Sequence, residues 1–199
     1  NGFANSSKIY ESFATFEDLS LMNSSKQGLY ASSSSVHVSD SMTTQLADFG
    51  MTLVSSEVVL RAWSANYHED GAAIDSESTL TVWSLTSLGN LRSDMTGYGT
   101  VNYGTAQILD IEETVNDNRL WETTVYFEDL TGNPVDADWQ TLGFSGTASS
   151  GSSVLPVSEI GSQITATFGG VGAISTPIGV EGGTHTIQVP IMPQGDWIL

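Results

Sequence analysis

The chain has 199 residues, with 23 acidic and five basic side chains, a formal net charge of −18 and no cysteine. A charge of this size repels nucleic acid and anionic lipid, so we expect neither as a partner. The absence of cysteine excludes disulfides and thiolate metal sites. No run approaches the roughly 20 apolar residues of a transmembrane helix, so we expect no membrane insertion.

The composition nevertheless indicates a folded protein. Hydrophobic residues make up 39% of the chain, including seven Phe, five Trp and six Tyr, whereas disordered acidic chains are poor in aromatic residues. The sequence begins at Asn1 with neither an initiator Met nor an apolar leader, which favours a removed signal peptide. We therefore expect an extracellular or cell-surface location.

Residues 1–27 differ from the rest of the chain. Ile9, Phe13 and Phe16 recur at helical spacing, although Phe16 and Leu19 are equally compatible with an irregular strand. We interpret this segment as an N-terminal arm, either a first helix packed on the core or an arm that docks into a neighbouring subunit. In the second case Phe13, Phe16 and Leu19 are the predicted subunit contacts. Residues 28–199 are expected to form one domain.

From Gly50 onward the pattern is one of short strands and turns. Apolar and polar residues alternate in several runs, and little helical periodicity is present. The runs are 51–54, 58–63, 80–85, 121–127, 164–168 and 187–191. A hairpin is predicted where 106–114 and 119–128 flank a turn at 116–118. The fold class predicted from this pattern is all-β, an antiparallel β-sandwich of jelly-roll type with an N-terminal arm.

No pattern of residues typical of an enzyme is present. The three histidines, His37, His68 and His185, are not accompanied by a Gly-x-Ser-x-Gly nucleophile motif. Asp110 and Glu112 share a predicted strand face, but neighbouring carboxylates are expected by composition in so acidic a chain. We therefore expect no enzymatic activity.

Hard cations are the most plausible ligands, because carboxylates gather in several predicted turns. The candidate metal ligands are Asp70 and Asp75 in one region and Asp136 and Asp138 in another. Neither region has the spacing of an EF-hand loop. Ca²⁺ is thus the one cofactor that the sequence suggests.

Two of the five tryptophans suggest a second type of site. Trp139 and Trp197 each follow acidic residues outside the patterned strands, so they are candidates for exposed rings that bind a ligand such as a sugar. This observation supports an alternative function as a carbohydrate-binding or adhesion module.

The function favoured by the sequence is a non-enzymatic structural subunit of an extracellular assembly, such as a filament, pilus-like fibre, surface layer or virion coat. Its partner is another copy of itself, joined through edge strands and the N-terminal arm. Because subunits of this charge repel one another, assembly or stability is expected to depend on salt or divalent cations.

Overall fold

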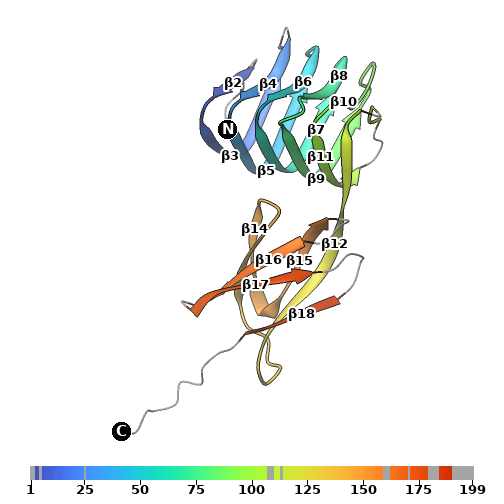
Figure 1. Ribbon diagram of the computed structural model, residues 1–199. Coiled ribbons are helices and arrows are strands. Elements are labelled where there is room, and N and C mark those ends of the chain that lie inside the picture. The colour runs from blue at the N-terminus through green and yellow to red at the C-terminus, as the bar shows by residue number, and fades with distance from the viewer. Residues whose placement is uncertain are drawn as a thin grey trace. The chain divides into compact units, whose positions relative to one another are not determined.

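The computed structural model describes residues 3–4, 6–24, 26–106, 110–112, 114–158, 162–169, 171–178 and 184–189. Within it the chain divides into two compact units, Asn1–Leu120 and Trp121–Leu199. Both are built from β-strands (Figure 1).

The first unit is a parallel β-solenoid. Successive strands alternate between two sheets, with orders β1-β3-β5-β7-β9-β11-β12 and β10-β8-β6-β4-β2. The pairings among the described residues of these strands are all parallel. The strands are β1 (Phe3–Ala4), β2 (Ser7–Tyr10), β3 (Phe13–Met22), β4 (Gln27–Ser32), β5 (Ser35–Gln45), β6 (Phe49–Val54), β7 (Glu57–Asn66), β8 (Asp70–Ile74), β9 (Thr79–Leu88), β10 (Met95–Gly97), β11 (Thr100–Ala106) and the start of β12 (Asn116–Asp129).

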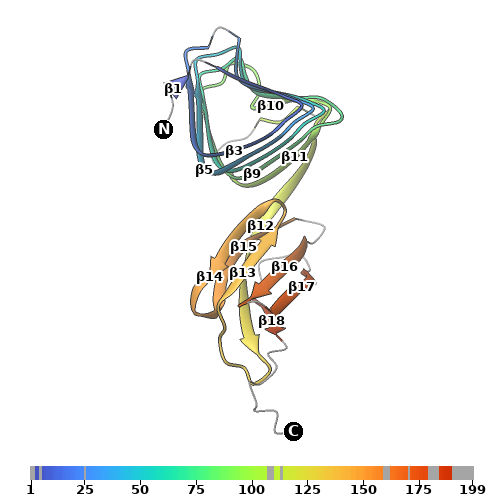
Figure 2. The same ribbon diagram turned by 90° about the vertical axis from the view of Figure 1, so that its left-hand side faces the viewer.

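Each turn of the solenoid, called a coil here, takes about 22 residues. Leu29 pairs with Met51, Met51 with Ala72, and Ala72 with Met95, which are steps of 22, 21 and 23 residues. The first coil comprises residues 7–28. The long strands bend at a shift of register, between Phe16 and Asp18 in β3, and the coils superimpose as a three-sided outline in Figure 2.

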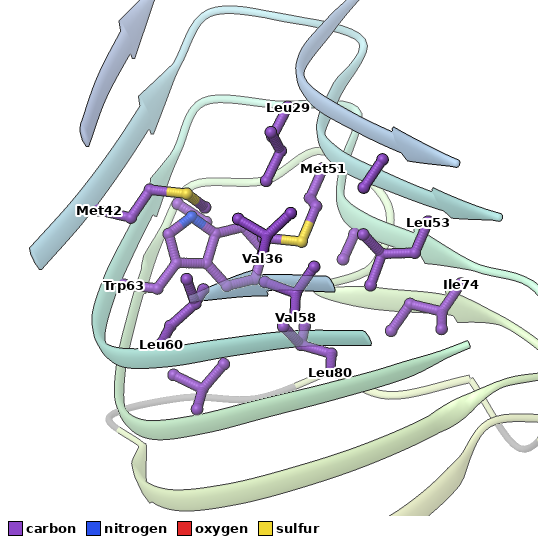
Figure 3. Close-up of a cluster of buried hydrophobic side chains, with 14 of the residues drawn as sticks. Leu29, Val36, Met42, Met51, Leu53, Val58, Leu60, Trp63, Ile74 and Leu80 are labelled. Carbon is purple, nitrogen blue, oxygen red and sulfur yellow. The ribbon is translucent and has the colours of Figure 1, made fainter. Parts of the chain in front are cut away.

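The interior of the solenoid is filled by rows of apolar side chains, one from each coil. Leu29, Met51, Ala72 and Met95 form one fully buried row, and Val36, Val58, Leu80 and Val101 form another. Figure 3 shows Leu29 and Met51 from one sheet and Val36, Val58 and Leu80 from the other, together with Trp63 in the interior. Alternate residues of each strand point inward, so one coil buries its apolar residues only when another coil is stacked on it.

One corner of the solenoid is fastened by serines repeated every 22 residues, which we call the serine ladder: Ser12, Ser34, Ser56 and Ser78. The N–H of Ser12 donates to Ser34 Oγ, that of Ser34 to Ser56 Oγ and that of Ser56 to Ser78 Oγ, over 3.0–3.3 Å. The Oγ of each of the first three donates to the carbonyl two residues earlier. The ladder thus satisfies buried polar groups at a corner where the strands end.

Glycines occupy the position where β4, β6 and β8 begin. A Cβ added to Gly28 would lie 2.7 Å from the carbonyl oxygen of Gly50, and one added to Gly50 would lie 2.7 Å from that of Gly71. Neighbouring coils approach each other here more closely than any larger residue allows.

The second unit combines parallel and antiparallel pairing. β12 continues from the first unit, and its later residues pair in parallel with β18, while β15 also neighbours it. A four-stranded antiparallel sheet has the order β14-β13-β16-β17. Phe127 and Phe168 meet edge to face in the core. The bounds are β13 (Ala137–Thr141), β14 (Phe144–Ala148), a 3-10 turn (Ser149–Gly151), β15 (Ser152–Ser158), β16 (Ser162–Phe168), β17 (Val171–Ile178) and β18 (Thr184–Val189).

The predicted antiparallel jelly-roll sandwich is therefore wrong, because most of the strands pair in parallel in a solenoid. Alternation of apolar and polar residues arises equally when strands face the interior of a coil. The predicted hairpin around 116–118 is also wrong, since Asn116 begins β12 and pairs in parallel with Thr100 of β11.

The boundary between the two compact units lies after Leu120. Residues 7–22 lie in β2 and β3 of the first coil, with Ile9, Leu19 and Leu21 in the same hydrophobic core as the later coils. The helical spacing of Ile9, Phe13 and Phe16 has a different origin, because the chain turns between β2 and β3.

Candidate functional site

A fully buried polar cluster lies inside the solenoid. The hydroxyl of Thr44 lies 3.1 Å from both Trp63 Nε1 and His68 Nε2, and Nδ1 of His68 lies 3.2 Å from both the backbone nitrogen and the carbonyl oxygen of Ala47. Thr44 and His68 are fully buried. In either tautomer the protonated ring nitrogen has an acceptor, the carbonyl of Ala47 for Nδ1 or the hydroxyl of Thr44 for Nε2. The cluster ties one corner of the solenoid to its core.

Burial lowers the pKa of His68 below 6.5, its ordinary value, despite hydrogen bonds to Ala47 and Thr44 that raise it. The unfolded chain therefore binds the His68 proton more readily than the folded chain, so we expect the stability contributed by this group to be lost as pH falls below about 6.5. Urea titrations between pH 7.5 and pH 5 test this. His68→Gln should show a shallower loss of stability with falling pH than the wild type; equal slopes would contradict it.

Asp70 and Asp75 lie at opposite ends of β8 and form separate hydrogen-bond networks. Asp70 is nearly buried and accepts from Arg92 Nη2 at 2.7 Å and from the Ser93 hydroxyl at 2.9 Å. Asp75 accepts the Ser55 N–H and, at 2.6 Å, the Ser78 hydroxyl. The structure thus uses both carboxylates to connect neighbouring coils and does not bring them together.

Asp136 and Asp138 are exposed at the start of β13 in the second unit. Asp136 accepts the N–H of Ser150 at 2.7 Å, and Asp138 accepts the hydroxyl of Thr147 at 2.8 Å. Within the described part of the chain, no three His, Asp or Glu residues come together as a group that would hold a metal ion.

Trp139 lies in the core of the second unit. It is 5% exposed, donates from Nε1 to Ser153 Oγ at 3.1 Å, and covers Gly146, where an added Cβ would lie 2.7 Å from its ring. Trp139 therefore presents no open ring face to solvent. Trp197 lies outside the described residues.

The predicted subunit contacts all lie on β3 of the first coil, but they differ in exposure. Leu19 is buried and Phe16 packs against the core, whereas Phe13 is 72% exposed. Tyr10 at the end of β2, which the sequence analysis did not select, is 54% exposed and lies against Tyr30 with ring centroids 5.5 Å apart. Exposed aromatic side chains also occur beyond the first coil, at Tyr67, Tyr98 and Tyr126.

The first coil has open strand edges. β2 pairs with β4 on one side only, and β1 covers β3 only at Ser20 and Leu21, so in the described residues the edge from Phe13 to Asp18 has no partner. Alternate N–H and C=O groups of an edge strand point outward and are available to another strand. This open first coil is the candidate functional site.

Backbone hydrogen bonds also connect the coils at the corner of the serine ladder. The carbonyl of Ser32 accepts the N–H of Glu11, and that of Val54 accepts the N–H of Ser33. Tyr10 occupies the same position in the first coil, and its carbonyl accepts the hydroxyl of Ser12.

The opposite end of the solenoid is covered. Asn116 to Arg119 of β12 pair with β11, and Ile111 forms a bridge with Met95 of β10. Val115 is buried in the core cluster, with Ile111 packed against it. Among the described residues, the last coil is therefore covered, whereas the edge of β3 from Phe13 to Asp18 is unpaired.

Neither a protein-family model, nor a curated protein, nor a solved structure matches this chain. The function therefore has to be argued from the site itself. The described residues also contain no helix long and apolar enough to cross a membrane.

Charge distinguishes the first coil from the rest of the chain. Residues 1–28 contain two of the five basic residues, Lys8 and Lys26, and three of the 23 acidic ones, Glu11, Glu17 and Asp18. They carry −1 of the formal charge of −18, which leaves −17 on the remaining residues.

A repeat in the sequence would have revealed the coils, and with them this site. The pairs Gly-Leu, Gly-Met and Gly-Ala begin at residues 28, 50 and 71, and two serines begin five residues after Gly28 and five residues after Gly50.

Proposed function

We propose that this protein is a non-enzymatic structural subunit of an extracellular assembly. The observation that carries the proposal is the edge of β3 from Phe13 to Asp18, which has no partner strand among the described residues and carries the exposed ring of Phe13. Proteins commonly protect the edges of their sheets, and an unprotected aromatic edge is typical of a surface that pairs with another chain.

The use of the polar residues supports the same proposal. Groups that serve as bases or nucleophiles in enzymes are engaged here in holding coils together: His68 with Thr44, Asp70 with Arg92, and the serine ladder. The carbohydrate-binding alternative depended on exposed rings at Trp139 and Trp197. Because Trp139 is buried, no described residue favours that alternative.

The acidic surface sets the conditions under which subunits associate. At about 0.01 M salt charges interact over roughly 30 Å, whereas at about 0.15 M they are screened beyond roughly 8 Å. Subunits with a formal charge of −18 should therefore associate more strongly as salt is raised. EDTA at constant salt would report any additional contribution from Ca²⁺.

The test is light scattering and electron microscopy of the purified protein over this range of salt, with antibody labelling of intact cells that produce it. We expect ordered particles larger than a dimer in about 0.15 M salt, and labelling at the cell surface. A protein that stays monomeric or dimeric at every salt and protein concentration, with or without Ca²⁺, would contradict the proposal.

A further inference from the structure

We infer that one corner of the solenoid binds the same corner of a second copy around a two-fold axis. This corner follows β5, β7 and β9 and carries three exposed apolar side chains, Leu46, Tyr67 and Leu91, which we call the apolar corner. The inference rests on the proposed function, because it names one contact between copies in the assembly. The backbone conformation of the corner, the exposure of its side chains and its charges support it.

The backbone at this corner is left-handed in successive coils. The last residues of β3, β5, β7 and β9 pair in register, so the next residue of each coil occupies the same position. The angle φ there is 55° at Asn23, 56° at Leu46, 57° at Tyr67 and 73° at Gly89. Asparagine and glycine adopt this conformation readily, whereas residues with large side chains rarely do, because their Cβ crowds the backbone. Leu46 and Tyr67 therefore occupy a position that disfavours them.

Burial within the described residues does not offset this disadvantage. Leu46 is 50% exposed, Tyr67 is 58% exposed and Leu91 is 79% exposed. The Tyr67 ring lies against Gly89, where an added Cβ would lie 3.3 Å from Cδ1 and Cε1. Leu91 is next to it, since its N–H donates to the carbonyl of His68 at 2.8 Å. Strained residues and groups of exposed apolar residues are typical of binding surfaces, so we assign this corner to a contact.

Charge indicates that a second copy occupies the corner. A row of exposed charged residues from neighbouring coils runs beside the apolar corner: Lys26, Asp48, Glu69 and Arg92. Lys26 and Arg92 are two of only five basic residues in the chain. A contact between copies of so acidic a protein has to place bases opposite acids, because like-charge pairs oppose association. This corner holds both kinds of charge beside its apolar residues.

A two-fold axis determines which residues meet. An axis perpendicular to the solenoid axis at the level of Tyr67 reverses the order of the coils in the second copy and keeps like rows facing each other. Tyr67 then meets its own copy, while Leu46 meets Leu91 and Asp48 meets Arg92, twice each. Glu69 faces its own copy near the axis, and each Glu69 keeps its ion pair with Arg92 at 3.1 Å. The contact thus buries the exposed apolar side chains and gives each Arg92 a further acidic partner.

Sedimentation velocity of the full chain in about 0.15 M salt, below the protein concentration at which larger particles form, tests this contact. The test variant is Leu46→Asn/Tyr67→Asn, since Asn23 already occupies the same position in the first coil. We expect dimers in the wild type and at least about tenfold weaker dimerisation in the double variant. Tyr98→Asn, at a residue that is 72% exposed after β10, is the control and should dimerise like the wild type.

Urea unfolding separates a contact residue from a residue that serves the fold. Because asparagine adopts the left-handed conformation more readily than leucine or tyrosine, the double variant should be at least as stable as the wild type when both are monomeric. A double variant that is less stable than the wild type would show that the two side chains serve the fold, and would overturn the inference.

A cysteine variant gives an independent reading, because the wild type contains no cysteine. Glu69→Cys, near the axis, should form a covalent dimer on mild oxidation, and Glu77→Cys, exposed beyond the other end of β8, should not. Monomeric wild type, unweakened dimers in the double variant, or equal cross-linking of the two cysteine variants would overturn the inference. If larger particles still form in those cases, the proposed function stands with a different contact. Dimers that depend on the corner but never grow would refute the proposed function alone.

Discussion

Gly50→Val should destabilise the solenoid by about 3 kcal/mol, because there is no space for a side chain between the coils at this position. A Cβ on Gly50 would lie 2.7 Å from the carbonyl oxygen of Gly71, 2.8 Å from Thr44 Oγ1 and 3.0 Å from His68 Cδ2. Two of these atoms belong to the buried Thr44 and His68, so neither neighbour can move without breaking the polar cluster. Equilibrium unfolding in urea measures the loss.

Thr52→Val is the matched control, since it adds the same side chain to the same strand, β6, on the half-exposed outer face. Its expected effect lies within about 0.5 kcal/mol of zero. A Gly50→Val protein that unfolds at the same urea concentration as Thr52→Val would show that the coils are not in close contact at the glycines.

Thr44→Val should cost a similar amount, about 3 kcal/mol, although the two side chains have nearly the same shape. The substitution removes the hydroxyl that lies 3.1 Å from both Trp63 Nε1 and His68 Nε2. Each buried group left without a partner costs roughly 1–3 kcal/mol. In one tautomer of His68 its Nε2 becomes a donor without an acceptor, and in the other it becomes an acceptor without a donor, so the penalty arises in both.

The control for this variant is Thr43→Val, one residue earlier in β5 on the outer face, where the side chain is only half-buried. Near-UV circular dichroism and urea titration should show Thr43→Val close to the wild type, with Thr44→Val less stable and its Trp63 signal altered. If the two variants are equally stable, the shared hydrogen bond contributes nothing to the fold.

Much of the strand content was predictable, because apolar and polar residues alternate along a strand in any β-fold in which one face of the strand meets a hydrophobic interior. The predicted runs 51–54, 58–63 and 80–85 lie within β6, β7 and β9. Alternation has a period of two and carries no information about which strand is next to which. Proximity in the sequence is then the remaining guide to which strands pair. It favours hairpins between consecutive strands, and hence an antiparallel sandwich.

The repeat was the missing information. Ser12, Ser34, Ser56 and Ser78 recur every 22 residues, but in a chain rich in serine this spacing does not stand out. Only the glycines Gly28, Gly50 and Gly71, which recur at nearly the same interval, distinguish the serine repeat from spacings that arise by chance in a serine-rich chain. The inward-facing residues of the coils vary in size, from Ala72 to Met51. A solenoid core tolerates such variation because each coil packs mainly on its two neighbours.

The candidate site was predictable in part. The sequence analysis singled out the apolar residues of segment 1–27, and Phe13 is indeed the most exposed of the three residues selected. It did not separate Phe13 from Phe16 and Leu19, because exposure depends on the bend of β3 and on which face meets the core. It did not select Tyr10 or Ser12, because the exposure of Tyr10 and the hydrogen bond from Ser12 to Ser34 are consequences of how the coils stack.

A disulfide cross-link tests the parallel register of about 22 residues per coil most directly, because the chain contains no cysteine. Ser35 pairs with Glu57 across β5 and β7, and Cα atoms of adjacent strands lie about 4.8 Å apart, within the range that a disulfide spans. The double variant Ser35→Cys/Glu57→Cys should close an intramolecular disulfide rapidly on oxidation, detected by mass spectrometry of the proteolytic fragments. Ser41→Cys/Glu57→Cys, with the first cysteine six residues further along β5, should not. Efficient closure of the second pair and not the first would contradict the solenoid.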